Sequence, residues 1–99
     1  MGIRIKYMCV NWIHTLPSEP VRIYSELSSD QLETRKVEAY ADGRMGLSDG
    51  DNSAGGSILS TEPLPSLQEI AMDPQFVPTE ITQEEFEIIW STALLSQQA

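Results

Sequence analysis

His14 and Cys9 are the residues of this chain best suited to acid–base or nucleophilic chemistry, and the sequence contains one of each type. Acid–base catalysis needs a positioned partner for the imidazole, but His14 precedes a proline-containing stretch and has no nucleophile in a suitable context beside it. Cys9 lies inside an apolar run, which favours a buried packing role for a free thiol. We therefore predict that the protein is not an enzyme; the alternative pairs His14 with Glu19 or Glu26 as acid and base.

Metal and cofactor chemistry is not indicated either. One histidine and one cysteine cannot complete a zinc site of the usual kinds within one chain. Residues 49–53, with the sequence DGDNS, begin like a calcium-binding loop. However, Ala54 stands where that loop requires glycine, and Ser60 stands where it requires a bidentate Glu. The sequence predicts neither a metal ion nor a cofactor.

Charge is distributed very unevenly along the chain. Residues 1–48 contain six basic and six acidic side chains, whereas residues 49–99 contain nine acidic side chains and no basic one. The formal net charge of −9 therefore belongs entirely to the second half. A field of one sign favours a cationic partner and repels the phosphates of nucleic acid. We predict a basic protein partner and no direct contact with nucleic acid.

A helix that begins after Thr82 is the strongest structural signal. Thr82 and Glu85 form a capping box, in which each side chain accepts a hydrogen bond from the other residue's backbone N–H. Apolar residues then recur at helical spacing and define a stripe toward the core: Phe86, Ile89, Trp90, Ala93 and Leu94. The opposite arc mixes acids and apolar residues: Glu84, Glu87, Ile88, Ser91 and Leu95.

Apolar side chains among acids on an exposed helix face have the anatomy of a protein interface, with anchors inside a charged rim. We predict a partner-binding surface that combines this face with nearby acids and the mid-chain loop: Glu80, Glu84, Glu85, Glu87, Ile88, Ser91, Leu95, Asp49 and Asp51. A purely structural alternative stays open, because acids in the first turn stabilise the helix dipole and Ile88 can contact a neighbouring loop.

The first half of the chain is typical of strands, since apolar and polar residues alternate with a period of two. We expect strands over residues 3–13, 21–27 and 33–41, and a fourth after residue 44. In the third strand one face is expected to hold Glu33, Arg35, Val37 and Ala39. The dipeptide Asp42-Gly43 predicts a type I′ hairpin turn between the third and fourth strands.

Residues 48–57 are rich in glycine and short polar residues, and we expect a mobile loop without regular structure there. Ile58 and Leu59 are expected to add a short edge strand. A second capping box, Ser66 with Glu69, predicts a short helix that ends before Pro74.

This order of elements predicts a single α+β domain over residues 1–99. Its mostly antiparallel sheet has about four to five strands in the N-terminal part, packed by one short and one longer C-terminal helix.

The longest apolar run, residues 8–13 with Asn11 inside it, is far shorter than the roughly 18 residues that a membrane span requires. We expect a cytoplasmic protein that does not contact a membrane.

Several stretches distributed along the chain form a combined pattern: Trp12-Ile13-His14, Pro17-Ser18-Glu19-Pro20, Tyr24-Ser25-Glu26-Leu27, Arg35-Lys36-Val37-Glu38 with Asp42-Gly43-Arg44, Pro63-Leu64-Pro65 with Asp73-Pro74-Gln75-Phe76, and Glu84-Glu85-Phe86 to Trp90. Through them nearly the whole chain resembles a family of small acidic bacterial proteins described as a domain of unknown function. The resemblance implies a shared fold and an origin in bacteria or their phages. It carries no assigned activity and no site residues.

The function that we expect is that of an immunity-type protein, which neutralises a cationic, nuclease-like toxin by occluding its active site. Such an inhibitor mimics the charge of nucleic acid. Two alternatives stay open. A phage-encoded inhibitor of a host nuclease defence would use the same mimicry. A small regulatory or ligand-binding module would instead hold a small molecule on the sheet around Trp12, Tyr24 and Tyr40.

Overall fold

The computed structural model describes residues 4–98 and shows an antiparallel meander in the N-terminal half. Its strands are β1 (Lys6–Trp12), β2 (Arg22–Leu27), β3 (Glu33–Ala39) and β4 (Met45–Ser48). Each pairs with the next along the chain, and the pairing of β3 with β4 is the one that Asp42-Gly43 predicts. Ile3, which belongs to the expected first strand, lies outside the described residues.

The turn between β3 and β4 differs from the predicted type I′ geometry. That turn needs positive φ at both central residues, but Gly43 has φ +93° while Asp42 does not have a positive φ. The Gly43 N–H donates to Tyr40 O at 3.0 Å, and the Tyr40 N–H donates to Arg44 O at 2.9 Å. The connection is therefore a three-residue hairpin loop closed by a left-handed glycine.

Residues 48–57 do hold a strand, contrary to expectation. After a turn in which Asp49 Oδ1 accepts the N–H groups of Asp51 and Asn52, the short strand β5 (Ser53–Ala54) pairs with β4. Ile58 and Leu59 do not form the predicted edge strand. The aspartate turn satisfies the loop backbone locally, which allows the chain to reverse.

A sixth strand, β6 (Phe76–Glu80), lies between the two helices in sequence and pairs with β1 at the opposite edge. The sheet order is β5-β4-β3-β2-β1-β6, so the sheet exceeds the predicted four to five strands. Pro78 is compatible with this edge position. The Ile81 N–H donates to Tyr7 O, and the Ile13 N–H donates to Gln75 O, so by antiparallel alternation the Pro78 nitrogen faces away from β1.

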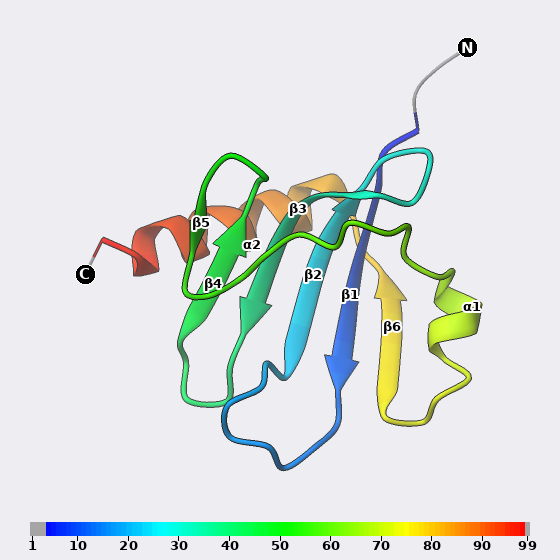
Figure 1. Ribbon diagram of the computed structural model, residues 1–99, viewed down its shortest axis with the longest axis horizontal. Coiled ribbons are helices and arrows are strands. Elements are labelled where there is room, and N and C mark those ends of the chain that lie inside the picture. Colours follow the sequence, from blue (N-terminus) through cyan, green and yellow to red (C-terminus); the bar gives the residue numbers. More distant parts are fainter. Residues whose placement is uncertain (1–3, 99) are drawn as a thin grey trace.

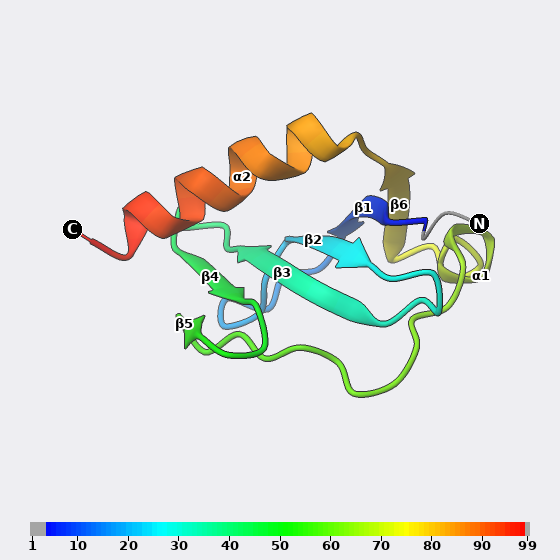
Figure 2. The same ribbon diagram turned by 90° about the horizontal axis from the view of Figure 1, so that it is seen from above.

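Both predicted helices form, and both capping boxes are present. Helix α1 (Leu67–Ile70) is a single turn beside β6, and α2 (Gln83–Ser96) is the long C-terminal helix. Figure 1 shows α2 behind the sheet, whereas residues 57–66 cross in front of it toward α1. The view from above separates these layers (Figure 2). No helix within residues 4–98 is long and apolar enough to cross a membrane.

Each face of the sheet carries its own apolar cluster. On the α2 face the buried residues Val37, Leu47 and Ala93 pack with Ile89 and Trp90. On the other face the buried cluster is Met8, Val10 and Leu27, covered by Leu64, Leu67, Ile70 and Phe76. The α+β class is therefore confirmed.

Leu94 was expected in the core stripe of the helix, but its side chain is 43% exposed. The C-terminal end of α2 extends beyond β4 and β5 in the view from above (Figure 2), so the sheet does not cover every residue of the predicted stripe.

Candidate functional site

The outer face of α2 is the largest part of the predicted partner-binding surface that the structure keeps together. Glu84, Ile88, Ser91 and Leu95 are all exposed, at spacings of three or four residues, so they form one stripe along the helix. Ile88 is 62% exposed and Leu95 is 67% exposed. We call these four residues the outer stripe.

Glu87, on the same helix, is instead engaged within the molecule. Arg35 of β3 reaches Glu87 Oε2 at 2.6 Å and Glu26 Oε2 at 2.7 Å. Its guanidinium also lies 4.9 Å from the centre of the Phe86 ring and 5.1 Å from that of Trp90. The Arg35 clamp, meaning Glu26, Arg35 and Glu87, therefore attaches α2 to the sheet.

The clamp shifts the pKa values of its members in the directions expected for ion pairs. Hydrogen bonds from Arg35 lower the pKa of the Glu26 carboxyl and that of Glu87. Hydrogen bonds to the two carboxylates raise the pKa of Arg35. This role of Arg35 was not predicted, because nothing in the sequence pattern of β3 indicates which side chain 52 positions later lies above it.

The remaining acids close to α2 divide into two groups. Glu85 is the third residue of α2 and completes the capping box by accepting the Thr82 N–H at 3.0 Å. Glu80 and Glu84 are exposed and make no ion pair or side-chain hydrogen bond within residues 4–98. We call these two carboxylates the acidic corner. Glu80, at the end of β6, lines the pocket on the face opposite α2, whereas Glu84 lies in the first turn of α2.

Asp49 and Asp51 lie far from this corner, in the turn between β4 and β5. Four inter-strand spacings separate β4 from β6, a distance of about 19 Å. Backbone hydrogen bonds from Asn52 and Asp51 lower the pKa of Asp49, so this aspartate also has a local structural role. The acids of the second half therefore do not form one continuous surface.

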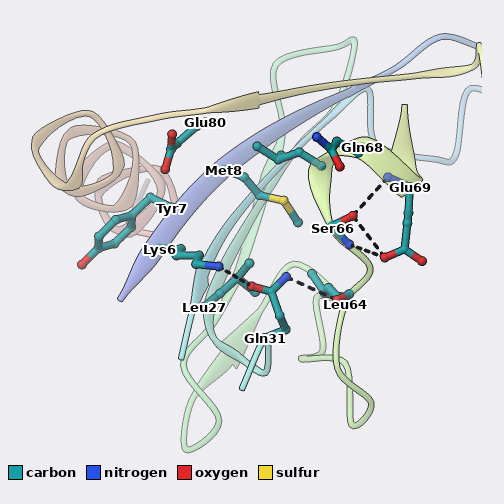
Figure 3. A pocket seen from close by; sticks show the side chains of 11 residues that line it. Lys6, Tyr7, Met8, Leu27, Gln31, Leu64, Ser66, Gln68, Glu69 and Glu80 are labelled. Carbon is teal, nitrogen blue, oxygen red and sulfur yellow. Dashed lines mark hydrogen bonds between the residues drawn. The ribbon is translucent and has the colours of Figure 1, made fainter. Parts of the chain in front are cut away.

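A pocket of about 510 Å³ opens on the other face of the sheet, between α1 and the ends of β1 and β6. Figure 3 shows Met8 and Leu27 against its inner wall, with Lys6, Gln31 and Glu80 around them. Gln31 bridges two walls, since its amide accepts from Lys6 Nζ at 3.4 Å and donates to Leu64 O at 3.4 Å. Sequence analysis did not predict this pocket.

A second hollow, of about 560 Å³, lies between the first half of α2 and strands β1, β2 and β6. Cys9 lines it and is half-buried rather than fully buried as predicted. Burial raises the pKa of its thiol, which disfavours the reactive thiolate. Arg22 lines the same hollow, and its hydrogen bond with Tyr24 raises the pKa of the guanidinium.

His14 has a structural environment in its loop. Its Nδ1 accepts the Leu16 N–H at 2.9 Å, so the other ring nitrogen carries the proton and donates to Pro20 O at 2.7 Å. The ring also contacts Trp12 edge-on, with 4.3 Å between centroids. Neither Glu19 nor Glu26 bonds to the imidazole; Glu26 instead belongs to the Arg35 clamp.

The aromatic residues of the ligand-binding alternative are not gathered on one face. Tyr24 pairs with Cys9, whereas Trp12 is one residue beyond Asn11, which pairs with Arg22. Because side chains alternate along a strand, Trp12 and Tyr24 point to opposite faces. Within residues 4–98 there is also no cluster of three or more His, Cys, Asp or Glu side chains able to hold a metal ion.

Within residues 4–98 the protein is a small α+β domain, in which a six-stranded antiparallel sheet has α2 on one face and a segment with the short α1 on the other. The chain belongs to the family described as domain of unknown function DUF6881, whose model matches residues 6–95. This confirms the resemblance noted from the sequence pattern. No curated protein and no solved structure matches the chain.

Proposed function

We propose that this protein is an immunity-type inhibitor that binds a cationic, nuclease-like toxin and occludes its active site. The observation that carries the proposal is the outer stripe, in which Ile88 and Leu95 are more than 60% exposed on a helix whose inner face is packed. Exposed apolar side chains of this size, on a stripe that begins with an acid, suit contact with another protein.

The outer stripe and the acidic corner have different expected roles. Ile88 and Leu95 supply apolar anchors, which lower the dissociation rate when they are buried in a complex. Glu80 and Glu84 have unpaired carboxylates within residues 4–98, and such charges attract a basic surface over a distance and raise the association rate. A nuclease active site must attract phosphate and therefore provides such a basic surface.

The test is a binding measurement with a cationic nuclease-toxin domain as the partner, performed at several salt concentrations. The double variant Ile88→Ser, Leu95→Ser is expected to weaken binding by about 2 kcal/mol or more, mainly through faster dissociation. Ile58→Ser is the matched control, since Ile58 is 75% exposed and lies outside α2. Equal binding by the double variant and the control would exclude the outer stripe as the interface.

The electrostatic part has its own measurement. Glu84→Gln is expected to slow association and to reduce the dependence of the association rate on salt. Glu62→Gln, an exposed acid in the segment on the other face, is the matched control. An association rate that does not change with salt would contradict a role for the acidic corner. If neighbouring genes encode phage anti-defence proteins, the same measurements apply to a host nuclease as partner.

A further inference from the structure

The pocket between α1, β1 and β6 combines an apolar inner wall with a rim that carries more negative than positive charge (Figure 3). From this geometry we infer that the pocket receives an arginine side chain of a protein partner. The identity of that partner as a basic protein rests on the proposed function. The ability of the pocket to hold a guanidinium group does not rest on the proposed function and can be measured by itself.

The inner wall suits the aliphatic part of an arginine. Met8 and Leu27 are buried members of the apolar cluster, and Leu64 and Leu67 pack against them from the covering segment. All four line the pocket. Arginine places its methylene stem along apolar surface while its charged end stays at a polar boundary, so this wall and rim match the two halves of the side chain.

The rim supplies carboxylates that the molecule itself does not neutralise. Glu80 makes no ion pair or side-chain hydrogen bond within residues 4–98. Glu69 uses Oε1 to accept both the Ser66 N–H, at 3.2 Å, and the Ser66 hydroxyl, at 3.1 Å, whereas Oε2 makes no such bond there. Lys6 is the one cation on the rim, and its ammonium donates to Gln31 and not to either carboxylate.

Arginine fits this rim better than lysine does. Its guanidinium is planar, presents several N–H donors to carboxylates and is more weakly hydrated than an ammonium group. Glu80 extends from β6 and Glu69 from α1, and Figure 3 shows them on different sides of the pocket. The guanidinium is placed at Glu80, which makes no ion pair or side-chain hydrogen bond within residues 4–98, while Glu69, with Oε1 engaged by Ser66, adds negative charge on the other side.

The walls are held in place by contacts within the chain. Gln31 adopts a positive φ of 66°, a conformation that is uncommon for a residue other than glycine. Its carbonyl accepts the Leu64 N–H at 2.8 Å, and its side-chain amide donates to Leu64 O at 3.4 Å. This pair of bonds fixes the covering segment against the β2–β3 turn, so the pocket is formed before a partner arrives.

The experiment is an NMR titration of the full chain, with methyl resonances of Met8, Leu27 and Leu67 as reporters. The probe is N-acetyl-L-arginine amide, and N-acetyl-L-citrulline amide is the uncharged control of the same length. Saturable shifts at these methyl groups are expected with the arginine probe, and binding at least about tenfold weaker with citrulline. Glu80→Gln is expected to weaken arginine binding about tenfold, whereas Glu62→Gln leaves it unchanged.

Three results would overturn the inference: no saturable shift with the arginine probe, equal binding of the two probes, or shifts confined to α2. A folded Glu80→Gln variant, verified by its unchanged spectrum, that binds arginine as tightly as the wild type would also exclude it. The proposed function is tested through Ile88, Leu95 and Glu84, none of which lines this pocket, so its failure is distinguishable from failure of the inference. Conversely, arginine binding here without binding of a basic protein would leave the pocket established and the inhibitor role rejected.

Discussion

The two faces of the sheet are covered by different means. On one face a 14-residue helix packs aromatic and aliphatic side chains into the sheet, with Phe86 and Ala93 fully buried. On the other face residues 57–75 contain a single helical turn, and their apolar side chains are only partly buried. A hollow of about 310 Å³ also lies among Met8, Val10, Leu64 and Phe76. The α2 face has a hollow of its own, of about 560 Å³ beside the first half of the helix. The two faces therefore differ in how deeply the covering side chains are buried, not in the presence of hollows.

Polar contacts compensate for the weaker packing of the second face. The Glu33 carboxylate is almost fully buried and accepts the Ser25 hydroxyl at 2.8 Å and the Ser60 N–H at 2.7 Å. Lys36 bonds the same carboxylate and also donates to Ile58 O. Helix α2 is therefore held mainly by its packed stripe, whereas the irregular segment also relies on specific hydrogen bonds.

Matched truncations in the two clusters give the sharpest test of this difference. Phe86→Ala is expected to lower the free energy of unfolding by about 4 kcal/mol, because the ring is fully buried. Leu67→Ala is expected to lower it by about 1–2 kcal/mol, since Leu67 is only partly buried. Urea denaturation of both variants measures the two values. Similar losses would show that the two faces are equally well packed.

The second prediction concerns the polar attachment of the covering segment. Glu33→Gln removes the negative charge that faces Lys36, and its amide NH₂ would face groups that are themselves donors. We therefore expect the free energy of unfolding to fall by about 3 kcal/mol. Glu62→Gln, at an exposed acid of the same segment, should change stability by less than about 0.5 kcal/mol. Hydrogen exchange at the Ser60 amide should accelerate only in Glu33→Gln. Unchanged protection there would show that Glu33 does not hold the segment.

Glu33 also shows where pattern reasoning about the sheet fails. Strict alternation predicts Glu33 and Arg35 on one face, but the register between β2 and β3 shifts next to Leu27. Glu33 therefore pairs with Leu27 on the face of the covering segment, while Arg35 lies under α2. A single extra residue in one strand moves the residues before it to the other face, and nothing in the local sequence specifies that shift.

Strand β6 was missed for a related reason. Its five residues include Pro78, which argues against a strand unless the chain lies at an edge with that nitrogen facing outward. Whether a strand is an edge strand depends on the whole sheet, and so cannot be deduced from the strand itself. The caps of both helices, by contrast, were predicted correctly because a capping box involves only four consecutive residues.

The candidate surfaces show the same difference between features set by nearby residues and features that depend on the whole sheet. Helical periodicity places Ile88 and Leu95 on an exposed face, and the structure confirms their exposure. The pocket, however, is assembled from β1, β6, α1 and the β2–β3 turn, and the Arg35 clamp joins residues 52 positions apart. Contacts between segments distant in the sequence depend on the order of strands in the sheet, which composition and periodicity do not supply.

Acidification should weaken the attachment of α2, with a smaller effect than the two changes above. Arg35 lowers the pKa of Glu26 and Glu87, so their ion pairs stabilise the fold at any pH above the unfolded value of about 4.3. That contribution is lost as the pH falls through the lowered folded values. The free energy of unfolding should therefore decrease as the pH falls below 5. This decrease should be smaller in Arg35→Met than in the wild type. Arg44→Met, at the exposed pair with Asp42, is the control.

The smallest effect on stability is expected on the outside of α2. Ile88 and Leu95 are mostly exposed and belong to neither apolar cluster, so the double variant Ile88→Ser, Leu95→Ser should keep its free energy of unfolding within about 0.5 kcal/mol of the wild-type value. Urea denaturation checks this before any binding measurement. A loss above about 2 kcal/mol would mean that these side chains support the fold, and their exposure would then be no argument for a partner. If the double variant keeps its stability but loses binding, the inner face of α2 packs against the sheet and the outer face contacts another protein.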